Sequence, residues 1–196
     1  MGSFFQVFIE HRVWLLSGLL LGLLLVSIWA IRRRRSKIGL EELLEAIGMD
    51  RVSDVLVSDG MGGEISIEHL VLTAKGLVIL DVKTITGTVF ASDQIDEWTV
   101  LTSTDRISIQ NPQRALHDRI TALRLLVRNV PVSGHVLFVE GADFSKGRPK
   151  DVLLSDELLV RYRKPEKTDL ESIMSAFLPH WETVCAACKP APTIGP

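Results

Sequence analysis

Three ionisable side chains interrupt two neighbouring segments that otherwise read as apolar strands. Glu68 lies in the segment Ile67–Leu72, and Asp81 and Lys83 end the segment Leu77–Lys83. Because Asp81 and Lys83 are two positions apart, their side chains leave the same face of a strand. Two carboxylates beside a lysine can hold a hard divalent cation and help water to attack a phosphodiester. The pattern therefore predicts a hydrolytic metal site.

The connection between the two segments decides whether the carboxylates meet. An even-numbered loop, either Ala74-Lys75 or Thr73 to Gly76, pairs Glu68 with Asp81 on one face, with Cβ atoms about 5 Å apart. A loop longer by one residue would shift the register and send Glu68 to the opposite face. His69 points away from this face and is expected to be a satisfied histidine rather than a ligand. Because two carboxylates this close repel each other, we expect Mg²⁺, or Mn²⁺, between them.

Helical and strand patterns alternate around this pair. A leucine stripe from Leu40 to Ile47 predicts a first helix. Asn111-Pro112 predicts the start of a second helix, which runs to about Arg128, and Thr168 with Glu171 forms a capping box for a third. Strands are predicted at 52–57, 65–72, 77–82, 88–90, 98–101, 135–139 and 152–154. This order predicts an α/β fold, a mixed β-sheet flanked by helices.

The composition excludes several other classes of protein. The 196 residues hold 22 Lys and Arg against 24 Asp and Glu, which excludes a strongly basic nucleic-acid coat and an acidic disordered tail. The two cysteines, Cys185 and Cys188, lie too close together for a long-range disulfide framework. We interpret them as ordinary thiols, and half of an intermolecular zinc site with His180 is the alternative.

Residues 13–31 form an uncharged apolar run that is long enough to cross a membrane. Nineteen residues at about 1.5 Å each match the hydrocarbon layer of roughly 30 Å. Trp14 and Trp29 mark the two ends, where indole rings favour the headgroup level. Gly18 and Gly22 offer a small-residue face through which the helix could form a homodimer. A cleaved signal peptide is the alternative, but the run is too long and charged residues precede it.

Basic residues after this run set its expected orientation. Arg32 to Arg35 and Lys37 outnumber the single Arg12 before the run, and an excess of Lys and Arg stays cytoplasmic. We therefore expect a single-pass protein of the cell inner or plasma membrane, in contact with the lipid bilayer, with its N-terminus outside and its domain in the cytoplasm. The predicted parts are an extracytoplasmic N-terminus (1–12), a transmembrane helix (13–31), a basic segment (32–37), one folded domain (38–180) and a flexible tail with the cysteines (181–196).

The predicted cytoplasmic part is acidic, although its second helix carries a basic stripe. Without residues 1–37, 16 Lys and Arg remain against 23 Asp and Glu, a net charge of −7. Such a domain repels a phosphodiester backbone unless a metal ion or a local basic face offsets the charge. Arg114, Arg124 and Arg128 are the candidates to meet a nucleic-acid backbone, and a solvated helix face is the alternative interpretation.

In these elements the chain resembles the nuclease-related domain (NERD), a branch of the PD-(D/E)XK restriction-endonuclease-like superfamily. The resemblance covers roughly Gly39 to Val139. The family pattern is a helical Glu, I-D-H on a strand, a glycine turn, E-x-K on the next strand, then Gly with an aromatic, Trp, and N-P opening a helix. The corresponding residues here are Glu41, Ile67-Glu68-His69, Gly76, Asp81-Val82-Lys83, Gly87 with Phe90, Trp98 and Asn111-Pro112.

The resemblance implies a restriction-endonuclease-like fold in which Glu68, Asp81 and Glu41 hold the metal ion and Glu68, Asp81 and Lys83 carry catalysis. Glu68 stands where the family has Asp, and Asp81 where it has Glu, so the two side-chain lengths are exchanged. Ala115 replaces a glutamine that often follows N-P. We expect a membrane-anchored, metal-dependent endonuclease that acts on nucleic acid, with DNA favoured. The alternative is a catalytically inactive scaffold that binds nucleic acid or protein at the membrane.

Overall fold

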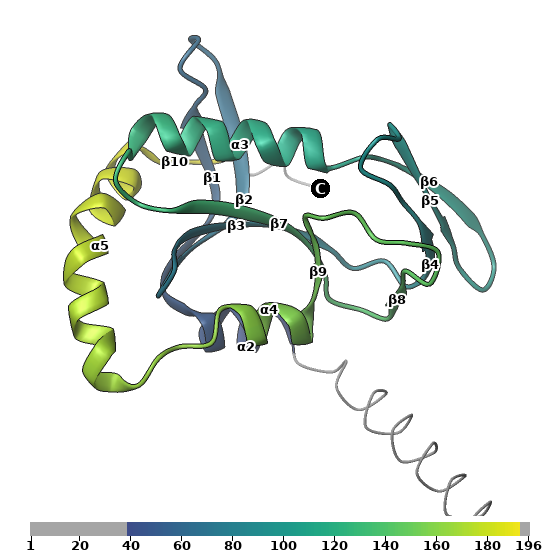
Figure 1. The fold of residues 1–196 in the computed structure, drawn as a ribbon. Helices are drawn as coiled ribbons and strands as arrows, with labels where there is room; N and C mark the ends of the chain where they lie inside the picture. The colour runs from purple at the N-terminus through teal and green to yellow at the C-terminus, as the bar shows by residue number, and fades with distance from the viewer. Residues whose placement is uncertain (1–38, 193–196) are drawn as a thin grey trace, which may run out of the picture. The chain divides into compact units, whose positions relative to one another are not determined.

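The computed structural model describes residues 39–192, and Figure 1 shows how their helices and strands are arranged. The predicted membrane segment 13–31 and the basic segment 32–37 lie outside these residues. None of the described helices is long and apolar enough to span a membrane. The described residues all belong to one compact unit, Ile38–Pro196.

The helices and strands follow the predicted order, with several additions. The helices are α2 (Leu40–Ile47), α3 (Gln113–Leu126), α4 (Ser155–Arg161) and α5 (Lys167–Ala187). The strands are β1 (Gly48–Ser58), β2 (Glu64–Thr73), β3 (Gly76–Lys83), β4 (Gly87–Phe90), β5 (Glu97–Leu101), β6 (Arg106–Gln110), β7 (Val132–Phe138), β8 (Ala142–Asp143), β9 (Val152–Leu154) and β10 (Lys189–Pro190). The helix α4 and the strands β6, β8 and β10 were not predicted. β8 and β10 have two residues each and α4 has seven, which is too short for a clear period, whereas β6 alternates polar and apolar side chains over Arg106–Gln110 and could have been predicted.

A mixed sheet in the order β10-β1-β2-β3-β7-β9 positions the predicted site. The strands β1, β2 and β3 are antiparallel neighbours, whereas β7 and β9 extend the sheet from β3 in parallel. In Figure 1, α3 crosses one face of this sheet, α2 and α4 cover the other, and α5 lies beside β1. A second mixed sheet, β6-β5-β4-β8, follows the end of β3. The prediction of an α/β fold with a mixed sheet and flanking helices is confirmed.

The hairpin between β2 and β3 has the two-residue loop Ala74-Lys75, one of the even-numbered connections that the sequence analysis considered. Thr73 pairs with Gly76, and the register continues to His69 opposite Leu80. Gly76 has φ +106°, and a Cβ there would lie 2.3 Å from the carbonyl oxygen of Pro131. A glycine is therefore required by both the backbone conformation and the space.

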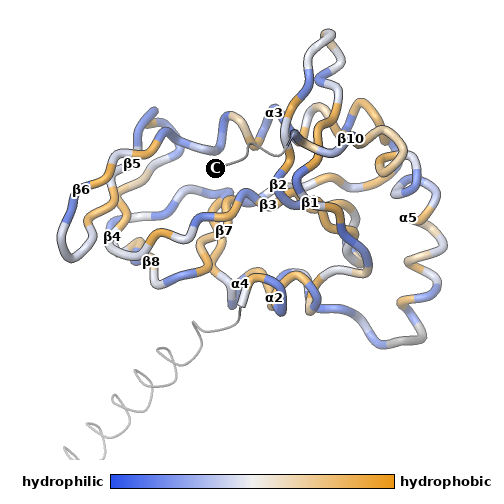
Figure 2. Tube along the Cα trace, turned by 180° about the vertical axis from the view of Figure 1, so that it is seen from behind, coloured by the Kyte–Doolittle hydropathy of each residue, from blue (hydrophilic) through white to orange (hydrophobic). Residues whose placement is uncertain are grey.

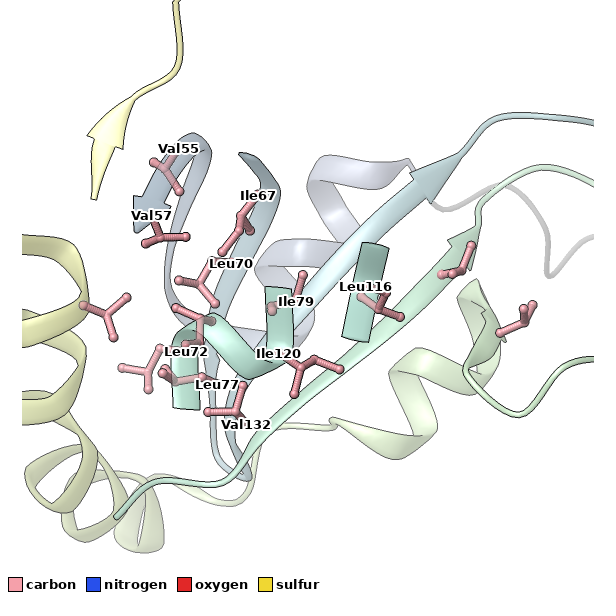
Figure 3. Packing of buried hydrophobic residues seen from close by; sticks show 14 of the residues in the cluster. Val55, Val57, Ile67, Leu70, Leu72, Leu77, Ile79, Leu116, Ile120 and Val132 are labelled. Carbon is pink, nitrogen blue, oxygen red and sulfur yellow. The ribbon is translucent and has the colours of Figure 1, made fainter. Parts of the chain in front are cut away.

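Apolar side chains fill both faces of the central sheet. Figure 3 shows Leu77 and Ile79 of β3 packed in the same cluster as Leu116 and Ile120 of α3. On the opposite face, Leu80 of β3 packs in a second cluster with residues of α2 and α4. Alternate residues of β3 thus serve both clusters, which explains the continuous apolar run of this strand, orange in Figure 2.

The predicted flexible tail from residue 181 is wrong over most of its length. Helix α5 continues to Ala187, and Trp181 and Val184 are buried in the cluster that lies under α3. Trp181 also donates a hydrogen bond from Nε1 to Oδ2 of Asp50 at 2.8 Å. Strand β10 then pairs with β1. The folded domain therefore needs this segment to complete its core.

Candidate active site

Asp81 lies at the end of β3 between two cationic side chains. Its carboxylate accepts hydrogen bonds from Nζ of Lys83 at 2.5 Å and from Nη1 of Arg119 at 3.4 Å. Asp81 is only 8% exposed, so its charge is compensated by partners where little water reaches it. The structure therefore brings Asp81 and Lys83 together, as their spacing on one strand predicts.

Arg119 is a site residue that the sequence analysis did not identify. It lies on α3 and donates from Nε to the carbonyl oxygen of Ser66 at 2.6 Å, in addition to its contact with Asp81. A single side chain thus connects α3 with β2 and with β3. Arg119 is three positions after Leu116 and four before Leu123, both buried. A charged residue beside the apolar stripe of a helix needs a partner, and this signal was available in the sequence.

The carboxylate of Glu68 contacts the backbone of β3, whereas the sequence predicted that it would face the side chain of Asp81. Its Oε2 accepts a hydrogen bond from the backbone N–H of Val82 at 3.0 Å, so the carboxylate caps the point where the β2–β3 ladder ends. On the other side of β2, Asp54 adopts φ +52° between residues that are paired with β2. Ile67 and Leu70 both join the cluster under α3, which breaks the strict alternation of β2 at this point.

Glu68 and Asp81 therefore do not form a simple cross-strand pair on one flat face. Glu68 leans towards the β3 backbone, whereas Asp81 points to α3 and its arginine. Both carboxylates still flank Val82 at the same end of the sheet. The Glu68 side chain is 44% exposed and its Oε1 lies 3.9 Å from Nε2 of His69, so an oxygen of Glu68 remains open to a ligand.

Glu68 and Asp81 are the two carboxylates that could hold a divalent cation at the end of β3. Mg²⁺ is usually bound through one or two carboxylates and keeps several waters. Across residues 39–192, no group of three or more His, Cys, Asp or Glu side chains is placed to hold a metal ion. The donor set at the end of β3 is thus limited to Glu68 and Asp81, and solvent or substrate oxygens would complete the coordination.

Glu41 is not brought to this pair. Helix α2 covers the face of the sheet opposite α3, and Glu41 forms an ion pair with Nη2 of Arg51 at 2.5 Å, with 73% of its side chain exposed. Nδ1 of His69 and Oγ of Ser53 form a hydrogen bond of 2.8 Å. His69 is therefore a partnered side chain next to Glu68.

The three arginines of the predicted basic stripe have separate environments. Arg114 pairs with Asp96 at 2.5 Å, and Nη2 of Arg124 donates to the carbonyl oxygen of Val132 at 3.0 Å. Arg128 lies beyond the end of α3, because Val127 is already extended and caps the helix with its N–H on Leu123. The stripe is therefore a set of exposed cations near α3 rather than one helical face.

Gln113 is the glutamine near the start of α3, whereas position 115, where the family often has a glutamine, is Ala115. Gln113 is 3% exposed, and its Oε1 has no hydrogen-bond partner among the described residues. Ala115 is exposed.

The two cysteines are partly buried, and burial raises the pKa of both the Cys185 and the Cys188 thiol, which favours unreactive thiols at neutral pH.

Comparison with known proteins identifies the family. A family model described as the nuclease-related domain, NERD, matches residues 33–139, a range that contains β2, β3 and α3 with all the side chains at the end of β3. Neither the curated proteins nor the solved structures contain a match to this chain. The family match spans more than half of the 196 residues. The chain therefore belongs to the nuclease-related domain family.

Proposed function

We propose that this protein is a membrane-anchored endonuclease that hydrolyses nucleic-acid phosphodiester bonds with the help of a divalent cation. The observation that carries the proposal is the convergence of Asp81, Lys83 and Arg119 at the end of β3, next to Glu68. This convergence lies inside the range that matches the nuclease-related domain. An acidic pair with a lysine and an arginine is suited to phosphodiester chemistry.

Each side chain has a separate task in this proposal. Glu68 and Asp81 hold Mg²⁺ or Mn²⁺, which, when bound, supplies polarisation of a phosphoryl oxygen and a more acidic water. Lys83 donates to the attacking water or to the negative charge that develops on the phosphate. Arg119 positions Asp81, because it is held in turn by the carbonyl of Ser66.

The surroundings of the site are also part of the proposal. The apolar run 13–31 and the basic residues after it support a single-pass anchor that keeps the domain on the cytoplasmic side of the inner or plasma membrane. Gly18 and Gly22 support a homodimer through this helix. Arg114, Arg124 and Arg128 supply cations for the backbone of nucleic acid, with DNA favoured, in a domain whose net charge is otherwise negative.

Incubation of the full-length protein with supercoiled plasmid tests the enzymatic proposal. We expect nicking with Mg²⁺ or Mn²⁺ and none with EDTA. Lys83→Ala should abolish nicking, whereas Lys75→Ala, an exposed lysine in the loop between the same two strands, should leave it unchanged. A fully active Lys83→Ala protein would refute the assigned role of this lysine.

A second candidate function is a scaffold that binds nucleic acid or protein without cleavage. The observation that favours it is that Asp81 already has two cationic partners, Lys83 and Arg119, which compete with a metal ion for its oxygens. Plasmid retention without nicking under every metal condition would support the scaffold. Nicking that depends on both the metal and Lys83 would support the enzyme.

A further inference from the structure

A polar pocket of about 400 Å³ lies at the open edge of β7, away from the residues of the candidate active site. Strand β9 pairs only with Val136 to Phe138, so β7 has no neighbour among the described strands on this side from Val132 to His135. Residues of α3 and β7 line the pocket together with Asp151 and Arg161. None of Glu68, Asp81 and Lys83 lines it.

Two guanidinium groups flank this open edge from opposite faces of the sheet. Arg124 belongs to α3 and Arg161 to α4, and Figure 1 shows these helices on the two sides of β7. Arg124 uses one N–H on the carbonyl oxygen of Val132 and keeps further donors. Burial and then the charge of Arg161 lower the pKa of His135, which lines the same pocket, to about 4. Arg161 and His135 line the same pocket.

Backbone groups of β7 and two hydroxyl side chains complete the lining of this edge. The carbonyl of Val132 and the N–H of Val136 both face outward, since they bond to Arg124 and to the carbonyl of Asp151. Gly134 lies between them, and alternate residues of a strand direct their peptide groups to the same side. Its N–H and its carbonyl oxygen are therefore both directed to the pocket. Thr121 and Ser133 also line the pocket, but the hydroxyl of Thr121 donates to the carbonyl oxygen of His117 and that of Ser133 is hydrogen-bonded to the hydroxyl of Tyr162.

Arginine side chains outnumber carboxylates in the lining of the pocket. Asp151 is its one carboxylate, and Oδ2 of Asp151 lies 2.8 Å from Nε2 of His117. His135 is neutral at physiological pH, because its pKa is about 4. The two arginines therefore leave the lining with an excess of positive charge and of hydrogen-bond donors, a combination that selects oxyanions.

We propose that this pocket binds a phosphate monoester on a ligand of about mononucleotide size, with Arg124 and Arg161 as a clamp on its oxygens. The volume is in the range of small-molecule pockets, ~300–1,000 Å³, and exceeds the needs of a bare phosphate. Ile120 and Val132, labelled in Figure 3, supply an apolar wall for the organic part. Such a monoester exists both as a free nucleotide and as the 5′ end of a nucleic-acid strand.

Binding to the full-length protein in EDTA tests this proposal, because the chelator keeps divalent cations out of the candidate active site. The probes are deoxyadenosine 5′-monophosphate, deoxyadenosine, and a short single-stranded oligonucleotide with either a 5′ phosphate or a 5′ hydroxyl. We expect the monophosphate to bind saturably and deoxyadenosine not to bind. Arg124→Gln and Arg161→Gln should each weaken binding about ten- to a hundredfold. Arg163→Gln, exposed just after α4, is the matched control and should leave the affinity unchanged.

The oligonucleotides distinguish the two sources of the phosphate. Tighter binding of the 5′-phosphorylated strand than of its hydroxyl twin, lost in Arg124→Gln/Arg161→Gln, assigns the pocket to strand ends as well as to free nucleotides. Equal affinity for the two strands, with saturable binding of the monophosphate, assigns it to free nucleotides. The proposal is overturned if the monophosphate does not bind at millimolar concentration, or if the double variant binds it as the wild type does while its circular dichroism shows a native fold.

Discussion

Protonation of His135 should make the stability of this protein depend on pH in a defined window. His135 is 4% exposed and donates or accepts through Nε2 a hydrogen bond to the hydroxyl of Tyr162 at 2.8 Å. Burial, reinforced by Arg161, lowers the pKa of the imidazole from 6.5 to about 4. Between these two values the unfolded chain binds a proton that the folded chain does not bind. Stability is therefore complete above pH 6.5 and is lost as the pH falls towards 4.

The size of the loss follows from the shift. At about 1.4 kcal/mol for each unit of pKa, the change from 6.5 to about 4 corresponds to about 3 kcal/mol of unfolding free energy. Urea unfolding between pH 7 and pH 4 measures it, with His135→Gln as the variant that cannot titrate. Carboxylates contribute to both profiles, so the informative quantity is the difference between them.

If the profiles of wild type and His135→Gln run parallel from pH 7 to pH 4, His135 does not carry the linkage. Nuclear magnetic resonance measures the pKa of His135 in the folded protein directly, without reference to the unfolded chain. The imidazole resonances should titrate near pH 4. A His135 that titrates near 6.5 in the folded state would overturn the assignment.

Three further predictions concern the candidate active site and the C-terminal helix. Asp81→Asn should weaken divalent-ion binding about tenfold or more in calorimetry, because it removes one of two carboxylate ligands, whereas Asp118→Asn on the exposed side of α3 should not. Arg119→Ala should lower plasmid nicking and Arg119→Lys should restore part of it, since Arg119 orients Asp81; equal activity of all three proteins would exclude a positioning role. Trp181→Ala should lower the unfolding free energy by about 3–5 kcal/mol in urea titrations, and a loss no larger than that of Leu178→Ala, which is 37% exposed, would contradict its place in the core.

The elements that position the site could be predicted from local patterns, whereas its precise contacts could not. Strict register between β2 and β3 follows from a short hairpin with Gly76, so the meeting of the two strand ends was accessible from the sequence. Asp54 lies on β1, between β2 and the distant strand β10, and its carbonyl oxygen accepts a hydrogen bond from the N–H of Ala191 at 2.8 Å, so no local pattern reveals its conformation or the break in the alternation of β2. The position of Arg119 beside the apolar stripe of α3 was a signal in the sequence, but its partners, Ser66 and Asp81, lie on other elements and could not be predicted from it.

The C-terminal segment shows a different limit of sequence patterns. Pro and Gly near the end favoured a tail, yet Trp181 and Val184 supply apolar surface that the cluster under α3 needs. The composition of a segment is an average over all its residues, whereas burial depends on single apolar side chains at the correct spacing. The segment that looked dispensable therefore holds part of the core, and the family match at residues 33–139 ends before it.

The exchanged lengths of the two carboxylates have a geometric explanation in this fold. The β2–β3 ladder ends at His69 and Leu80, so at Glu68 the strand β2 no longer supplies a backbone acceptor to Val82. A glutamate is long enough to reach that N–H from β2, and it thereby stays at the end of β3. Asp81 needs no such reach, because Lys83 shares its strand and Arg119 approaches from α3. The longer side chain, Glu68, is thus on β2, where the pairing with β3 has ended. The shorter one, Asp81, is on β3, beside Lys83 and Arg119. Both carboxylates therefore stay next to Val82.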